Sequence, residues 1–186
     1  MSAVREKWNQ RYGARAQAAP ATPAFVTEVA PSLRRGSVLD VAAGDGAASL
    51  ALARLGFRVT AVDIAEVGLA RLQAFAAAEQ LEIPTHCRDL AQPHCLQQLG
   101  SFDNILVCRY KPEATLWPQL AAALVPGGLL AFSTFNLQRH EEHGFPARFC
   151  VQPGELAHIH SQLELLHCAS VTRGADSFDD YLFRRR

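Results

Sequence analysis

Two glycines and an aspartate are spaced so that they could hold a nucleoside. Gly44 and Gly46 follow an apolar segment, Val38–Val41, and precede an alanine-rich one. Glycine can adopt a positive φ and present its N–H with no Cβ in the way, so the backbone can approach a ligand closely here. Asp63 ends the next apolar segment, where a carboxylate can accept both hydroxyls of a ribose. Either feature alone could be an ordinary turn or the cap of a helix that begins near Ala65, but together they predict a nucleoside site.

A dinucleotide is disfavoured at this site. The GxGxxG fingerprint that binds a pyrophosphate would require a third glycine where Ser49 stands. Asp40 lies four residues before Gly44. Its carboxylate would repel a pyrophosphate, but it can help to anchor a cationic amino-acid group through hydrogen bonds. The residues therefore favour a nucleoside ligand with a cationic end.

The segments that carry these residues predict an α/β fold. Short β-branched or leucine-rich runs alternate with alanine-rich runs at helical spacing, which is typical of a parallel sheet with helices on both faces. The predicted strands are Ser37–Val41, Arg58–Asp63, Ile83–Arg88, Phe102–Cys108, Gly128–Phe135, Leu163–Thr172 and Tyr181–Arg185.

Helices are expected between the strands. Apolar residues recur at helical spacing over Leu69–Ala76 and over Leu116–Leu124, and Pro126-Gly127-Gly128 stops the second of these helices. After the fifth strand we expect a polar loop, Asn136–Gln152, and then a short helix that begins near Pro153. The loop is long and its second half carries aromatic residues, so we expect it to close over a bound ligand.

The composition excludes several classes of protein. The 186 residues suit one domain, and Lys+Arg and Asp+Glu are equal at 18 each, so no net charge attracts nucleic acid or an anionic membrane. No apolar run approaches the roughly 20 residues of a membrane span, and residues 1–30 lack the apolar core of a signal peptide. We therefore expect a cytoplasmic protein. The five cysteines form no CxxC pair, which predicts free thiols and no metal site.

The segments DVAAGDG and AVDIA resemble the first motif, and the one that follows it, of class I S-adenosylmethionine-dependent methyltransferases. The resemblance implies a Rossmann-like, mostly parallel sheet of seven strands with an antiparallel final strand, and S-adenosyl-L-methionine as the cofactor. It places Asp40, Gly44 and Gly46 beside the methionine part of the cofactor. Ala42 stands where the family usually has its first glycine.

The same resemblance gives roles to residues that follow the next strands. It implies that Asp63 binds the ribose, that Ile64 packs on the adenine and that Asp89 faces the adenine amino group. Leu90 and Cys108 are assigned to the cofactor site as well. Asp89 could instead be the cap of a helix that follows it.

A closer resemblance, to the small bacterial tellurite-resistance and thiopurine-type methyltransferases, covers most of the chain. It rests on Trp8–Tyr12, on Phe102–Tyr110 with Val125–Gly128, and on Gly144–Leu156. It implies that Trp8 and Tyr12 cover the bound cofactor, where plain packing is the alternative, and that residues 144–156 close over the acceptor.

The length of the chain and the proline-containing stretch Ala16–Pro23 give the domain prediction. We expect a single domain, 1–186, with a covering segment and linker at 1–23 and the α/β core at 24–186. The last hairpin lacks the His-Arg pair of the tellurite enzymes and offers only Arg173, so the acceptor of those enzymes is not carried over.

Three residues are candidates for chemistry at the acceptor. Arg109 follows the fourth strand, at the edge where open α/β sheets bind ligands, and could hold an anion. Tyr110 could donate a hydrogen bond, and His143 could take a proton from a thiol or a phenol. The alternatives are that Arg109 forms a surface ion pair, that Tyr110 packs in the core and that His143 belongs to a solvated loop. The segment Cys108–Pro112 lacks the Asn/Asp-Pro-Pro-aromatic signature of enzymes that methylate amines in nucleic acid, which disfavours that acceptor.

The sequence therefore predicts an enzyme, EC 2.1.1.-, that methylates a small nucleophilic acceptor: a thiol, a chalcogen oxyanion or another anion. The alternative is an RNA-directed or non-catalytic protein of the same fold, because residues 1–35 carry six Arg or Lys against two Glu and the chain ends in three arginines. Those charges would have to form one patch. Whether the protein is a monomer or a homodimer is left open.

Overall fold

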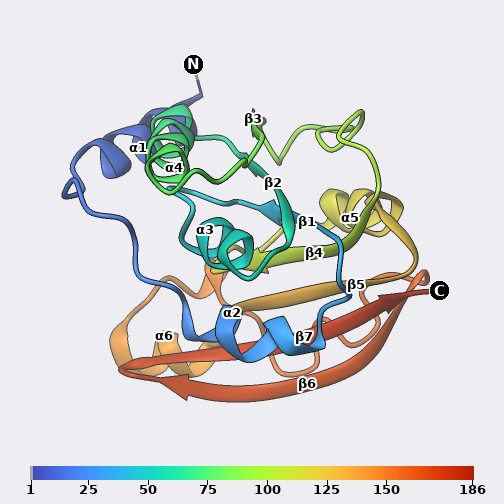
Figure 1. Ribbon diagram of the computed structural model, residues 1–186. Helices are drawn as coiled ribbons and strands as arrows, with labels where there is room; N and C mark the ends of the chain where they lie inside the picture. The colour runs from blue at the N-terminus through green and yellow to red at the C-terminus, as the bar shows by residue number, and fades with distance from the viewer. Residues whose placement is uncertain (1) are drawn as a thin grey trace.

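A seven-stranded sheet in the order β3-β2-β1-β4-β5-β7-β6 forms the centre of the molecule (Figure 1). The computed structural model describes residues 2–186. Strands β1 to β5 are parallel, and β7 runs antiparallel to both β5 and β6. This confirms the predicted class I methyltransferase fold. The strands are β1 Ser37–Val41, β2 Arg58–Asp63, β3 Thr85–Cys87, β4 Phe102–Cys108, β5 Leu124–Phe135, β6 Leu163–Arg173 and β7 Asp176–Arg185.

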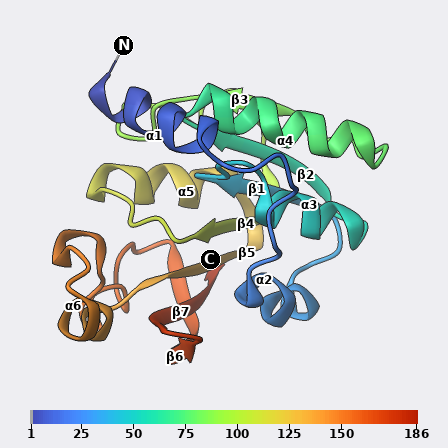
Figure 2. The same ribbon diagram turned by 90° about the vertical axis from the view of Figure 1, so that its left-hand side faces the viewer.

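Helices cover the two faces of the sheet unequally (Figure 2). The α-helices are α1 Ala3–Gly13, α2 Ala24–Val29, α3 Ala47–Arg54, α4 Glu66–Ala78, α5 Trp117–Ala123 and α6 Leu137–His143, and the 3-10 turns are η1 Ala30–Ser32, η2 Ala114–Leu116 and η3 Ala147–Phe149. One apolar core lies between the sheet and α2, α3 and α4, and the other lies against α5. None of the helices in residues 2–186 is both long and apolar enough to cross a membrane.

Strand pleating explains how one segment serves both cores. Leu39 and Val41 of β1 belong to the core against α5, whereas Val38 of the same strand belongs to the core against α2, α3 and α4. Alternate residues of a strand point to opposite faces, and both faces are buried here, so the segment is almost continuously apolar.

Two strands, β5 and β7, begin earlier than predicted. The second predicted helix ends at Ala123, and Leu124 already begins β5, so Pro126-Gly127-Gly128 lies inside the strand beside an irregularity in its pairing with β4. Strand β7 begins at Asp176 rather than Tyr181. Its first half is polar, but Asp179 and Asp180 are paired inside the protein, and such buried polar residues hide the strand from a hydrophobicity pattern.

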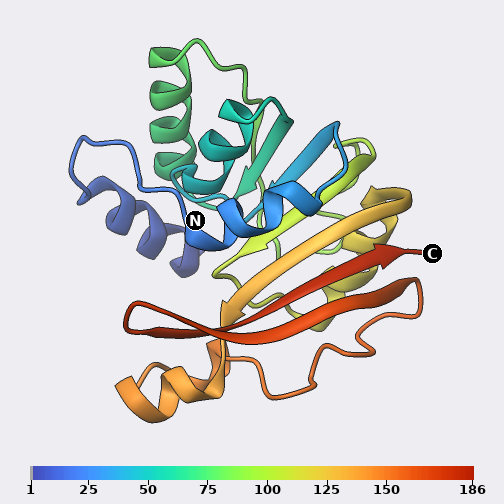
Figure 3. The same cartoon turned by 60° about the horizontal axis from the view of Figure 1, so that its bottom comes forward.

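The loop predicted at Asn136–Gln152 contains helix α6, and no helix begins near Pro153 (Figure 3). Gly144 ends α6 in the left-handed conformation, with φ +64°. Beyond it the chain forms turns, since Gly154 has φ +75° and breaks any helix there. Lys111 Nζ donates to the carbonyl of Cys150 and ties this end of the segment to the core. The strand predicted at Ile83–Arg88 is likewise shorter, Thr85–Cys87.

Candidate functional site

The loop between β1 and α3 curls at the carboxyl edge of the sheet. Ala42, Gly44 and Gly46 all have a positive φ, of 61°, 59° and 88°. The N–H of Ala43 donates to the carbonyl of Val62 at 3.1 Å. The loop is therefore folded against the end of β2, which brings the glycines next to the residues that follow that strand.

The glycines of this loop also allow close packing. A Cβ on Gly46 would lie 2.2 Å from Cδ1 of Leu72, and a Cβ on Gly44 would lie 2.2 Å from Oη of Tyr12. Gly68 of α4 packs directly against the loop, because a Cβ added at Gly68 would lie 2.8 Å from the carbonyl oxygen of Gly44. The sequence reasoning missed Gly68, although a glycine inside a helical run is a signal for such an approach.

Ala42 is a non-glycine residue in a left-handed conformation, at the place where the family usually has glycine. That conformation brings Cβ close to the next carbonyl oxygen. We expect Ala42→Gly to raise the free energy of unfolding by about 0.5–1 kcal/mol, because the relief of this contact exceeds the extra entropy of glycine in the unfolded chain. Urea denaturation measures it. Ala74→Gly, at an exposed position within α4, is the matched control and should lower stability. A lower stability for both variants would contradict the strain argument.

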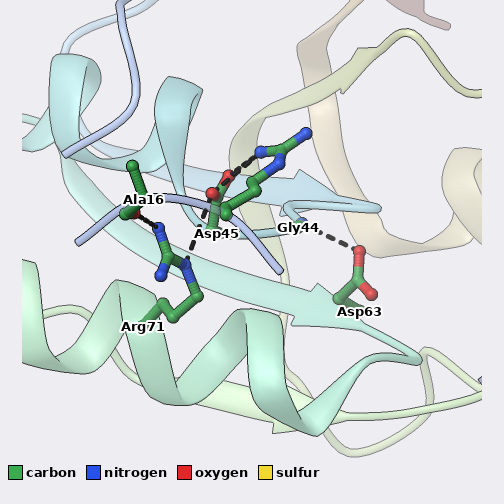
Figure 4. A network of polar contacts seen from close by, with 6 residues as sticks. Ala16, Gly44, Asp45, Asp63 and Arg71 are labelled. Carbon is green, nitrogen blue, oxygen red and sulfur yellow. Dashed lines mark hydrogen bonds and ion pairs between the residues drawn. The ribbon is translucent and has the colours of Figure 1, made fainter. Parts of the chain in front are cut away.

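Asp63 binds the glycine loop directly (Figure 4). Its Oδ2 accepts from the N–H of Gly44 at 2.8 Å and its Oδ1 accepts from the N–H of Ala65 at 2.7 Å. The side chain is buried, and burial raises its pKa. Asp63 thus fixes both the loop and the turn into α4, and each oxygen keeps a second lone pair with which a hydroxyl could bond.

Asp40 lies inside the sheet, on the face toward α3. It is 1% exposed, and its Oδ2 accepts from Oγ of Ser49 at 2.5 Å. Burial is the main cause that raises the pKa of this carboxyl group to about 7. The Ser49 hydrogen bond opposes the shift, and the charge of Asp63 adds to it. Asp40 therefore exchanges its proton near neutral pH.

Helix α1 lies over the glycine loop and beside α4 (Figures 1 and 2). Tyr12 is buried against Gly44, and Trp8 stacks on Tyr12 with ring centroids 5.9 Å apart. Asn9 Oδ1 accepts from the N–H of Val67 at 3.1 Å, which caps an α4 that has no capping side chain of its own. The structure thus brings Tyr12 to the glycine loop and Trp8 to Tyr12, and the cover of a bound cofactor that the resemblance implied stays a prediction.

Asp45, the residue between the two glycines, makes an ion-pair cluster that the sequence reasoning missed. Its carboxylate accepts from Arg15 at 2.7 and 2.8 Å and lies 3.7 Å from Nε of Arg71. Arg71 also donates to the carbonyl of Ala16 at 2.7 Å (Figure 4). The cluster joins the end of α1, the glycine loop and α4.

The residues assigned to the adenine follow β2 and β3, at the same edge. The N–H of Arg88 donates to the carbonyl of Asp63 at 2.8 Å, which places the chain after β3 beside the chain after β2. Asp89 Oδ1 accepts from the N–H of Ala91 at 3.0 Å, so it stabilises a local turn, and turns rather than a helix follow it. Leu90 is buried, whereas Ile64 is half-buried.

The ends of β4 and β5 form the other half of the edge. Cys108 lies on the α2 face, and burial raises the pKa of its thiol to about 12. Arg109 has φ +59°, and its N–H donates to the carbonyl of Ser133 at 2.7 Å. A small cavity here is lined by Pro23, Ala24, Phe25, Cys108, Arg109, Ser133, Arg173 and Phe178.

Two arginines face one phenyl ring at this cavity. The guanidinium of Arg109 lies 5.9 Å from the ring centroid of Phe178, and that of Arg173 lies 5.7 Å from it. Arg173 is neutralised by ion pairs with Glu28 and Asp180. Within the part of the chain that the structure describes, Arg109 has no such carboxylate partner. Its positive charge is therefore available at the edge.

Tyr110 and His143 do not gather around Arg109. Tyr110 packs against the α5 core, on the opposite face of the sheet, and burial raises its pKa to about 12. His143 is exposed on α6, 3.9 Å from Glu142. Neither position tests a catalytic role, so both roles stay predictions.

The fold and this edge define the class of protein, since a sheet of this order with a glycine loop after β1 and an acid after β2 is the class I methyltransferase fold. Residues 38–128 match the family described as a methyltransferase domain. Ubiquinone biosynthesis O-methyltransferases of Xanthomonas euvesicatoria and Xanthomonas axonopodis are 38% identical over 106 residues, which are 53% of this chain and 43% of theirs. The chain thus spans less than half the length of these curated relatives.

Solved structures show the same fold at low sequence identity. A protein from work on the conversion of a disulfide bond into a thioacetal group during echinomycin biosynthesis aligns with a TM-score of 0.80 and 17% identity, over 98% of this chain and 91% of its own. TehB from Haemophilus influenzae aligns with a TM-score of 0.73 and 19% identity, over 98% and 67%. Magnesium protoporphyrin IX methyltransferase from Synechocystis, with S-adenosylhomocysteine bound, aligns with a TM-score of 0.73 and 18% identity, over 98% of each chain.

Residues 38–128 thus match a methyltransferase domain, and the fold of the chain is that of the class I S-adenosylmethionine-dependent methyltransferases. Its edge residues fit that cofactor chemically: Asp63 offers oxygens for the ribose hydroxyls, and Ile64 and Leu90 offer apolar surface for a base, whereas Asp40, predicted for a cationic end, is 1% exposed and bonded to Ser49. The individual roles of these residues, and of Cys108, remain to be tested.

Proposed function

We propose that this chain methylates a small nucleophilic acceptor, a thiol, a chalcogen oxyanion or another anion, that is held by Arg109. The observation that carries the proposal is the uncompensated guanidinium of Arg109, on the same sheet edge as Gly44 and Asp63. Arg173, its neighbour across Phe178, is already neutralised. Among residues 2–186, the site therefore offers the free positive charge of Arg109, which suits an acceptor with a single negative charge.

S-adenosylmethionine, when bound, supplies a methyl group on a positively charged sulfur, which an acceptor takes by in-line displacement. The tasks left to this chain are to align the acceptor and to exclude water, because water stabilises separated charges more than the partly neutralised transition state. Arg109 can orient an anionic acceptor. The thiol of Cys108 has a pKa raised to about 12, so it stays protonated at neutral pH and does not compete as a nucleophile.

The base, where one is needed, depends on the acceptor. A thiolate or another anion needs none. For a hydroxyl acceptor, Tyr110 is poorly suited, since it lies on the other face and its raised pKa keeps it protonated. His143 remains the candidate. The relatives from Xanthomonas are O-methyltransferases by name, so hydroxyl compounds belong in any acceptor screen.

The RNA-directed alternative required the basic residues at the two ends to form one patch. Figures 1 and 3 place α1, which carries Arg5, Lys7 and Arg11, far from the C-terminus, whereas Arg34 and Arg185 both donate to carbonyls at the start of β5, those of Pro126 and Leu124. Arg15 is paired with Asp45 and Arg184 with Glu164. The arrangement favours a small-molecule acceptor over an RNA.

We expect Arg109→Gln to raise KM for an anionic acceptor by about tenfold to a hundredfold, the loss expected for one charged hydrogen bond. The affinity for S-adenosylhomocysteine should not change. The test screens thiols, phenols and small carboxylic acids with S-adenosylmethionine, follows formation of S-adenosylhomocysteine, and then compares the variant on the best acceptor. Arg184→Gln is the control, because it removes the same charge from an exposed site at the far end of β7. Equal KM values in all three proteins would overturn the role of Arg109.

A further inference from the structure

In this structure, helix α1 covers the glycine loop, and only a few of its side chains attach it to the rest of the protein. Helix α1 lacks an apolar face: of the residues in Ala3–Gly13, only Tyr12 is buried. Apolar burial alone therefore attaches it weakly to the core. Its position must depend on the polar contacts that it makes.

Those contacts lie at two points. In the middle of the helix, Asn9 caps α4 through the N–H of Val67. Just beyond its end, Arg15 bonds both oxygens of Asp45, and the carbonyl of Ala16 accepts from Arg71. The second point bears directly on the cofactor loop, because Asp45 lies between Gly44 and Gly46.

The burial of Asp45 gives this second contact its strength. Its side chain is 5% exposed, whereas that of Arg15 is 41% exposed. Arg71, 12% exposed, stays beside Asp45 whatever α1 does, because it belongs to α4. Movement of α1 away from the core therefore breaks the short bonds from Arg15 and leaves only the longer contact to Arg71 at 3.7 Å.

The geometry also shows what the closed helix covers. Tyr12 lies between the two attachment points, with its hydroxyl against Gly44. A ligand that touches Gly44 must share that space with Tyr12 or enter while the tyrosine is displaced. Asp45 itself points at the arginines and not into the site.

We infer that Asp45 is a positioning residue that acts through Arg15 and Arg71. Its ion pairs form a latch, which holds α1 closed with Tyr12 on the glycine loop. Opening of this latch sets the rate at which the cofactor enters and the product S-adenosylhomocysteine leaves. This inference rests on the cofactor site of the proposed function. It assigns to Asp45, the residue between Gly44 and Gly46, a task that is separate from contact with the cofactor.

The test begins with the free protein. Arg15→Gln removes the latch without altering the loop, and Arg15→Lys keeps a charge but loses the paired bonds. Hydrogen exchange of residues 3–16 should become about tenfold faster in Arg15→Gln, as expected for the loss of a charged hydrogen bond to a buried partner, and Arg15→Lys should lie between it and the wild type. Glu79→Gln is the control, since it removes the exposed Arg54–Glu79 pair between α3 and α4, and it should leave α1 unchanged.

The second measurement is the dissociation rate of S-adenosylhomocysteine, followed by tryptophan fluorescence with Trp8 as the reporter in α1. Arg15→Gln should speed dissociation about tenfold. Raising NaCl from about 50 mM to about 500 mM should speed it in the wild type and not in Arg15→Gln, because salt screens only an ion pair that is present. A merely structural role for Arg15 would not produce this salt dependence.

The outcomes separate the latch from the cofactor assignment. Unchanged exchange in α1, or faster exchange with an unchanged dissociation rate, overturns the latch while the proposed function stands. Failure of the wild type to bind S-adenosylhomocysteine at all overturns the proposed function, and the latch with it as a cofactor device, whereas the exchange data still report whether Arg15 holds the helix.

Discussion

Replacement of Asp63 by alanine is expected to weaken the binding of S-adenosylhomocysteine by about 1–3 kcal/mol, the range for removal of a charged hydrogen-bond partner. Two effects add in this variant. The carboxylate proposed for the ribose is lost, and the N–H groups of Gly44 and Ala65 lose their acceptor, so the loop is no longer held in its curled form. Calorimetric titration of the wild type and the variant measures the loss.

Asp63→Asn separates the two effects. Asparagine keeps one carbonyl oxygen and nearly the same volume, so the loop retains an acceptor for Gly44 or for Ala65. Its amide presents donors in place of the other oxygen, which leaves one N–H unpaired and weakens a bond from a ribose hydroxyl. We expect Asp63→Asn to be less destabilised than Asp63→Ala. Its affinity for S-adenosylhomocysteine should fall by nearly as much as in Asp63→Ala. Wild-type affinity in Asp63→Asn would mean that this side chain shapes the loop without contacting the cofactor.

The strands around the cofactor edge could be predicted almost residue by residue. β1, β2 and β4 have the predicted bounds, because strands buried on both faces are nearly continuous apolar runs. β7 could not be predicted in the same way. Its first half carries Asp179 and Asp180, which are buried but paired with Asn136, Ser170 and Arg173. Such pairing follows from the fold, and a local pattern does not reveal it.

The cover of the site shows a second limit. The segment Trp8–Tyr12 is recognisable by resemblance, but the contacts that attach it join residues far apart in the chain. Arg15 and Asp45 are 30 positions apart, and Asn9 and Val67 are 58 apart. A charged residue at Arg15 or Asp45 reads as ordinary surface in the sequence. Only the arrangement of α1 across the loop turns the two into an ion pair.

The acceptor side was the least predictable part of the edge. Arg109 and Tyr110 are neighbours in the sequence, yet they lie on opposite faces of the sheet. β4 ends at Cys108 and Arg109 has φ +59°, so the alternation of the strand does not continue: Arg109 shares the face of Cys108, and Tyr110 turns to the other. The sequence therefore indicated the right strand end but not which of the two side chains shares a face with Cys108.

Asp40 should make the stability of the protein depend on pH in a direction opposite to that of an ordinary paired carboxylate. Burial raises its pKa to about 7 in the folded protein, whereas an unfolded chain has the ordinary value near 3.8. Between these values the folded state holds a proton that the unfolded state has released. The contribution of Asp40 is therefore complete below about pH 4, decreases as pH rises through 7, and amounts to about 4 kcal/mol at 1.36 kcal/mol per pKa unit.

Asp40→Asn isolates this contribution, because asparagine stays neutral and its carbonyl oxygen can still accept from Ser49. Urea denaturation at a series of pH values should show the variant and the wild type converging near pH 4 and the variant more stable at pH 8. The raised pKa of Asp63 adds a slope of the same sign in both proteins, and the difference between them reports Asp40 together with its coupling to Asp63. Cofactor binding gives a second readout. If the ionised carboxyl group of Asp40 anchors the cationic end of the ligand, the affinity for S-adenosylhomocysteine rises from pH 6 to pH 8 in the wild type and not in Asp40→Asn. A stability difference between the two proteins that does not change with pH would show that Asp40 titrates near its ordinary pKa despite its burial. An equal pH dependence of S-adenosylhomocysteine binding in both proteins would show that Asp40 does not contact the ligand.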